Sequence, residues 1–223
     1  MNWFQKWCAR YWLCAVYGLG LGMLAAMPAF PDMTMERKLP FLLAVLLPLH
    51  VLEENTWPRG FHYMMNLVRK SDRPNAGPMN TLTNMVSNLG AELLLIGLAL
   101  GGGSPGTTLL VAFFGFGETA AHTVLGVAVR KKLRDRGMRT IYGPGLATAC
   151  LTLLPLSVRA VAYLRSLTLT GGDLLTGAVL AACFVGGLIR LPIQALGRFQ
   201  PGYAFPDSGY FERFRRASDR PSP

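Results

Sequence analysis

The arrangement of charge along this chain constrains its fold more than any other feature. Charged residues fall in short groups, and apolar runs separate these groups along most of the 223 residues. A run of about twenty apolar residues is long enough to cross the ~30 Å hydrocarbon core of a bilayer. The pattern predicts an all-α, polytopic transmembrane helical bundle, in which any function lies within the bundle or at its faces.

Six runs are long enough to be predicted as spans. Their approximate ranges are 12–30, 39–58, 79–101, 107–129, 140–158 and 174–191. The first run follows Lys6 and Arg10 and ends in small residues, as a signal peptide does, but its length favours a retained span. We therefore expect residues 1–197 to form the transmembrane domain and residues 198–223 to form a polar, mostly disordered cytoplasmic tail.

The positions of the basic residues predict the orientation of the chain. A net charge of +10 is compatible with nucleic-acid binding, but the charges gather in only a few segments. If both chain ends lie inside, the basic groups before residue 12, at 59–73, at 130–139 and in the tail all face the cytoplasm. Cytoplasmic loops of membrane proteins carry such an excess of Lys and Arg. Membrane lipids, rather than nucleic acid, are therefore the expected surroundings.

Ionisable side chains inside the predicted spans are the strongest functional signal, because each costs roughly 2.5–3.5 kcal/mol to insert. His50, Glu53 and Glu54 lie in the second run at helical spacing, and Glu118 and His122 lie four residues apart in the fourth. His50 precedes Arg59 by nine residues and His122 precedes Arg130 by eight. At 1.5 Å per residue both histidines lie about 12–14 Å inside the cytoplasmic edge, which predicts rings within about 10 Å of each other.

Further polar side chains are expected at or near this level. Asn84, Asn88 and Glu92 lie in the third run. The Tyr142-Gly-Pro-Gly bend starts the fifth run and directs Tyr142 or Thr148 towards the level of the two histidines. We interpret these five as catalytic residues or as neighbours that support the metal ligands. His62, in the amphipathic stretch beside the second run, is expected at the membrane interface instead.

Imidazole and carboxylate groups facing one another in a helical bundle indicate a metal site. The predicted ligands are His50, Glu53, Glu54, Glu118 and His122, holding one or two first-row divalent ions, with Zn or Fe favoured by this ligand chemistry. Two simpler interpretations remain open. Glu53 and Glu54 would pair with Arg59 if they lie near the interface, and Glu92 would serve as a hydrogen-bonding group between helices.

The segment His50-Val-Leu-Glu53-Glu54 resembles the signature of bacterial membrane proteins named for an HXXEE motif. The later segments Glu118-Thr-Ala-Ala-His122 and Tyr142-Gly-Pro-Gly-Leu-Ala-Thr148 resemble two further parts of that family, so the similarity extends over roughly residues 39–155. The family has no established activity, so the resemblance implies a shared polar site in a bacterial cytoplasmic (inner) membrane and supplies no reaction. Intramembrane CAAX-type proteases are a weaker match, because Pro58 stands where their EExxxR motif requires arginine.

Three classes of function fit the sequence. The leading one is a metal-dependent membrane enzyme, a hydrolase or an oxidoreductase, that acts on a lipid-like or small hydrophobic substrate. The second is a small transporter or a proton- or cation-coupled permease that uses the same polar groups. The third is a non-catalytic membrane partner protein stabilised by buried polar contacts.

Overall fold

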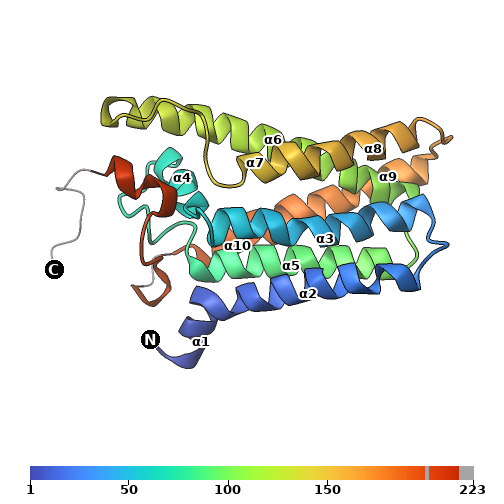
Figure 1. Ribbon diagram of the computed structural model, residues 1–223, viewed down its shortest axis with the longest axis horizontal. Coiled ribbons are helices and arrows are strands. Elements are labelled where there is room, and N and C mark those ends of the chain that lie inside the picture. Colours follow the sequence, from blue (N-terminus) through green and yellow to red (C-terminus); the bar gives the residue numbers. More distant parts are fainter. Residues whose placement is uncertain (199–200, 216–223) are drawn as a thin grey trace.

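The computed structural model describes residues 1–198 and 201–215, and every regular element in that part of the chain is helical. The helices are α1 (Trp3–Lys6), η1 (Trp7–Tyr11), α2 (Trp12–Ala26), η2 (Met27–Ala29), α3 (Met35–Asn55), α4 (Phe61–Val68), α5 (Thr81–Leu100), α6 (Pro105–Leu133), η3 (Arg134–Arg136), α7 (Leu146–Thr148), η4 (Ala149–Leu153), α8 (Leu154–Leu164), α9 (Gly171–Ala182), η5 (Cys183–Arg190), α10 (Leu191–Leu196), η6 (Pro201–Tyr203) and η7 (Gly209–Phe214). Several join end to end, so the molecule consists of six long rods lying along its longest axis (Figure 1).

Five of these rods are long and apolar enough to cross a membrane. They comprise Trp3–Ala29, Thr81–Leu100, Pro105–Arg136, Leu146–Leu164 and Gly171–Leu196. The sixth rod, α3, has 21 residues but carries charged residues in both its first and its last turns. The prediction of an all-α bundle with membrane-spanning helices is therefore confirmed, and α3 is the least apolar of its six rods.

Capping residues explain where the central helices begin. The Asn80 side chain accepts a hydrogen bond from the Thr83 backbone and the Thr83 hydroxyl bonds back to Asn80, and Ser104 and Thr107 form the same box at the start of α6. These boxes satisfy N–H groups that the first turn of a helix leaves without partners. Both helices therefore start at defined points, which fixes the register of the polar residues further along them.

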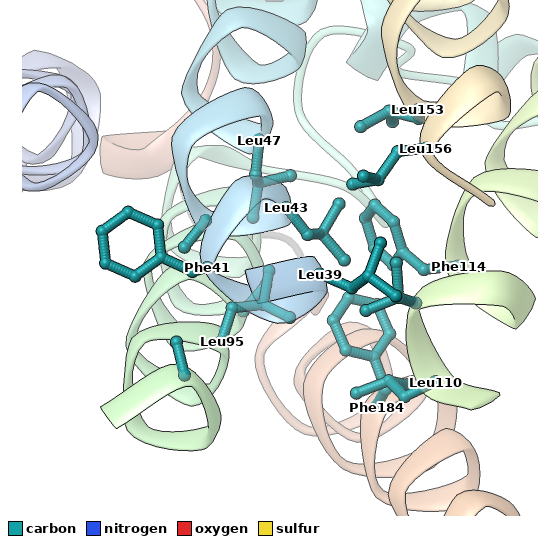
Figure 2. Packing of buried hydrophobic residues seen from close by; sticks show 14 of the residues in the cluster. Leu39, Phe41, Leu43, Leu47, Leu95, Leu110, Phe114, Leu153, Leu156 and Phe184 are labelled. Atoms are coloured by element: carbon teal, nitrogen blue, oxygen red, sulfur yellow. The ribbon is translucent and has the colours of Figure 1, made fainter. Parts of the chain in front are cut away.

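The apolar core lies around α3, which packs against α2, α5, α6 and α8. Figure 2 shows Leu39, Leu43 and Leu47 of α3 facing the side chains of neighbouring helices, including Leu95 and Phe114. A Cβ atom on Gly115 would overlap Ser157 and the Leu153 backbone, so glycine allows α6 to approach η4 and α8 closely. Close packing on several sides holds the last turns of α3 at a fixed position relative to α6.

The prediction of a disordered tail is wrong for residues 201–215. These residues fold back onto α4 at the end of the bundle where the N-terminus lies (Figure 1). Phe211 is fully buried in a second apolar cluster with Tyr63 and Met64 of α4 and with the end of α6. The rest of the predicted tail, including residues 199–200 and 216–223, lies outside the described residues.

His62 anchors this folded tail and does not face a membrane interface as expected. Its ring stacks on Phe205 with centroids 3.6 Å apart, and Nε2 donates a hydrogen bond to the Asp207 carbonyl at 3.0 Å. Burial is the main cause that lowers the pKa of His62 to about 3. Arg59 forms an ion pair with the Asp207 side chain. The alternative interpretation, in which Arg59 pairs with Glu53 and Glu54, is therefore wrong.

Candidate metal centre

Two helices supply the histidines, and their close contact brings the rings together. His50 lies near the end of α3 and His122 lies in α6, and their ring centroids are 5.0 Å apart with planes at 86°. The predicted proximity of these two histidines is confirmed. Depth counting from the basic segments succeeded because both histidines lie within continuous α-helices, whose rise per residue is constant.

Four side chains converge at this point, and we call His50, Glu54, Glu118 and His122 the His/Glu group. Glu54 Oε1 lies 3.6 Å from His50 Nε2 and 3.2 Å from His122 Nε2. Glu118 Oε2 lies 3.8 Å and 3.6 Å from the same two nitrogens. Ligand atoms bound at about 2.1 Å to one tetrahedral ion lie roughly 3.4 Å from each other. These four nitrogen–oxygen distances are close to that value, and the ligand atoms of His50, Glu118 and His122 all lie within 4.8 Å of one another.

His50 is held in one tautomer by Thr148. The Thr148 hydroxyl has one hydrogen and donates it to Glu53 Oε2 at 2.6 Å, so it accepts from His50 Nδ1 at 2.9 Å. The proton therefore lies on Nδ1 and the lone pair on Nε2, which points at the two carboxylates of the group. Metal-binding histidines are commonly oriented in this way by a hydrogen bond at their other nitrogen.

His122 provides the strongest argument for a metal site. Its side chain is 0% exposed, and neither ring nitrogen forms a hydrogen bond within the part of the chain that is described. The Phe61 and His122 ring centroids are 4.8 Å apart, and Gly145 lies against the edge of the imidazole that carries Cε1, Nδ1 and Nε2. Nε2 lies at ion-pair distance from both carboxylates, 3.2 Å from Glu54 and 3.6 Å from Glu118. A cation bound at Nε2 would lie between the imidazole and these carboxylates, so the residues present fit a metal ion.

Glu53, predicted as a ligand, has its oxygens turned away from the His/Glu group. Its Oε1 accepts hydrogen bonds from the Tyr142 hydroxyl at 2.9 Å and the Ala147 amide at 3.2 Å, and its Oε2 accepts the Thr148 amide at 2.7 Å besides the Thr148 hydroxyl. Burial, and then the neighbouring Glu53, raise the pKa of Tyr142, so the phenol stays protonated and keeps donating. Through these hydrogen bonds, Glu53 holds the segment 142–148 against the end of α3.

The remaining predicted residues divide between two places. Asn84 donates to Asn55 Oδ1, and Asn88 donates to the Asn84 side chain at 2.9 Å. Both asparagines line a cavity beside the His/Glu group. Glu92 is fully buried in α5, and neither of its oxygens has a hydrogen-bond partner among the described residues. The expected hydrogen bond from Glu92 to another helix is therefore absent from this part of the chain.

The cavity has a volume of about 200 Å³ and extends between α3, α5, α6 and η5. His50, Glu54 and Glu118 form part of its wall, and the Glu118 side chain is 22% exposed. Phe61 and Gly145 are the contacts that sequence reasoning missed. Phe61 lies in a stretch that we interpreted as interfacial. The Tyr142-Gly-Pro-Gly bend was identified from the sequence, but its contact with His122 was not predicted.

The fold and this group define a class: a helical bundle with membrane-spanning helices and a buried His/Glu group that could hold a metal ion. A family model described as a protein of unknown function with HXXEE motif matches residues 41–160, which is more than half of the chain. The chain therefore belongs to the HXXEE-motif family, and the predicted resemblance is confirmed. No curated protein and no solved structure matches it.

Proposed function

We propose that this protein is a membrane-embedded, metal-dependent enzyme of the bacterial inner membrane that acts on a lipid-like or small hydrophobic substrate. The observation that carries the proposal is the convergence of two histidine Nε2 atoms and two carboxylates at 3.2–3.8 Å, in a group where His122 has no hydrogen-bond partner among the described residues. A structural polar cluster would instead pair His122 with Glu54 and Glu118 as ion pairs and hold no metal, and the metal analysis below separates the two.

His50, His122 and Glu118 are the ligands that we assign to a single divalent ion, because their ligand atoms all lie within 4.8 Å of one another. Two histidines and one carboxylate hold zinc in hydrolases and Fe(II) in oxygenases, and both kinds of site keep positions open for water or substrate. The ion would supply a Lewis acid next to the cavity. Of the two reaction classes, hydrolysis of an ester or amide is the one that this group supports with no further cofactor.

Glu54 is then the group that moves a proton. Its Oε1 lies within 3.6 Å of both Nε2 atoms, and its side chain lines the cavity. A general base must lie within hydrogen-bond reach of the proton it takes, either directly or through one water. Glu54 would accept the proton of an attacking water at Oε1 and return it to the leaving group. Glu53 and Thr148 position His50 and take no proton.

The test begins with metal analysis of protein purified in detergent after growth with zinc and iron supplied. We expect about one ion per chain in the wild type and in Glu92→Gln, which alters a buried carboxylate outside the group, and little in His122→Ala. A chelator should lower the thermal midpoint of the first two proteins only. Wild-type protein that purifies without metal and ignores chelators would end the proposal and leave a structural role for the group.

Activity is followed by mass spectrometry of a bacterial lipid extract incubated with the metal-loaded protein. Glu54→Gln should keep the ion but lose turnover, because it removes the proton acceptor and leaves the three assigned ligands in place. Uptake of the ion into proteoliposomes, with no change in any lipid, would instead favour a cation permease.

A further inference from the structure

The cavity beside the His/Glu group is amphiphilic, and its polar part lies in the middle. On α3 and α6 this middle layer is formed by His50, Glu54 and Glu118, and on α5 it is formed by Asn84 and Asn88. A polar group at this level would therefore face the metal ligands on one side and amide groups on the other.

The lining becomes wholly apolar on the side away from α4. Leu47, Ala91, Phe114 and Phe184 come from four different segments, and each lies about one turn deeper than the polar residues or directly below them. The Phe114 and Phe184 rings meet edge to face with centroids 5.0 Å apart at 83°, and both belong to the buried core (Figure 2). We call these four residues the floor of the cavity.

The floor lies close to the reactive groups. Phe114 precedes Glu118 by four residues and Leu47 precedes His50 by three, so the floor is about 4.5–6 Å below them along the helix axes. Each bond of an extended chain advances roughly 1.2 Å. Because the last carbon of such a chain must stay about 3.5–4 Å from the floor atoms, the space accepts only one or two carbon atoms beyond the reacting carbon.

The side towards α4 is lined differently. Phe61, Met65, Met79 and Leu125 provide apolar surface there, including two methionines. Methionine side chains adapt to differently shaped ligands more readily than aromatic rings do. A larger and more variable apolar group therefore fits better on this side than on the floor side.

We propose that the substrate is an amphiphile whose reacting polar group carries a short acyl branch, of about three carbons or fewer, on the floor side. Its larger apolar part lies on the side of α4, and Phe184 sets the length limit of the short branch. This inference rests on the proposed function, because it takes the His/Glu group as the place where the polar group reacts.

The probes for this limit are N-octyl hydroxamic acids whose acyl chain varies from two to eight carbons. The hydroxamate chelates the metal, the octyl group is constant, and the acyl chain samples the floor. Affinity for the zinc-loaded protein is measured by calorimetry in one detergent, and the measured micelle partition of each probe is subtracted, because partition rises with acyl length. After this correction, burial of each methylene should raise the affinity roughly 4-fold, up to about three carbons, after which it should fall.

Phe184→Ala removes the ring at the floor and should move the maximum to longer acyl chains by two or more carbons. Phe184→Leu should move it less and provides a milder variant if the alanine protein is unstable. Met65→Ala enlarges the same cavity on the other side and should leave the maximum where it is. Affinity that keeps rising to eight carbons in the wild type, or a maximum that Met65→Ala moves and Phe184→Ala does not, would overturn the inference.

These outcomes are separate from a failure of the proposed function. Hydroxamates that bind the wild type and require His122, but show no length limit, would remove only the substrate assignment. Wild-type protein that takes up no zinc would remove both.

Discussion

Gly145 is the position where one added methyl group should disrupt the metal centre most directly. Its φ of +98° lies in the left-handed region, where an L-residue costs roughly 1–2 kcal/mol. A Cβ atom there would overlap His122 Cε1 and would lie 2.7 Å from both Nδ1 and Nε2. Since carbon and nitrogen atoms pack at about 3.5 Å, the imidazole or the turn would have to move by roughly 0.8 Å or more.

That displacement exceeds the ~0.5 Å tolerance of a preorganised site. Overpacking adds about 1–3 kcal/mol to the backbone cost, so Gly145→Ala should lower stability by roughly 2–5 kcal/mol in all. We also expect zinc affinity to fall at least 10-fold, because the displaced ring is one of the assigned ligands. Competition with a fluorescent chelator measures the affinity, and thermal unfolding in detergent measures the stability.

Gly143→Ala is the matched control in the same bend. Its Cβ would meet the end of the flexible Met64 side chain, which can move aside, and it does not touch His122. This variant should bind zinc as the wild type does. A Gly145→Ala protein with unchanged zinc affinity would show that His122 is not held as a ligand against this turn, and the reasoning for the site would fail.

Three further predictions follow from other parts of the structure. Thr148→Val removes the hydroxyl that bridges histidine and carboxylate and should weaken zinc binding by about 10–100-fold, whereas Thr148→Ser should retain it. Because the pKa of His62 is lowered to about 3 from the ordinary ~6.5 of an undocked histidine, docking of the tail should weaken as pH falls below about 6.5 towards 3. Amide protection factors around Asp207, corrected for the intrinsic exchange rate at each pH, should be lower at pH 4.5 than at pH 7.5, and His62→Gln should abolish this difference, whereas unchanged protection factors would refute it. Reporters fused after Gly103 and after Arg136 should lie in opposite compartments, and the same compartment for both would disprove the predicted topology.

Much of the bundle could be predicted from the sequence because membrane-spanning helices leave a simple signal. Long apolar runs, the basic segments that bound them and the constant rise of a helix were enough to predict that His50 and His122 would meet. Helix α3 shows the limit of hydropathy, because the charges that make it functional also lower its apolar signal.

The division of roles between Glu53 and Glu54 could not be obtained from spacing. Adjacent residues point about 100° apart on a helix, and either could have faced α6. The decision depends on the bend at residues 142–145, whose positive-φ Gly145 turns the backbone amides of 147 and 148 towards Glu53. Such a turn is set by tertiary contacts, which helical periodicity does not encode.

The folded tail was missed for a related reason. Residues 201–215 are polar on average, which indicates disorder, but a few aromatic residues carry most of their packing. Phe205 stacks on His62 and Phe211 fills a cluster formed by α4 and α6. Both partners are far away in the sequence, so no local pattern revealed them.

X-ray absorption at the zinc edge tests the central claim most directly, because it reports the atoms bound to the ion itself. Zinc-loaded wild-type protein should show nitrogen and oxygen neighbours at about 2.0–2.1 Å, with the multiple scattering of two imidazole rings. His122→Ala should reduce the imidazole signal to one ring or lose the ion. Sulfur neighbours at about 2.3 Å would assign the ion to the cysteines, and a spectrum without imidazole scattering would contradict the metal centre proposed for His50, Glu118 and His122.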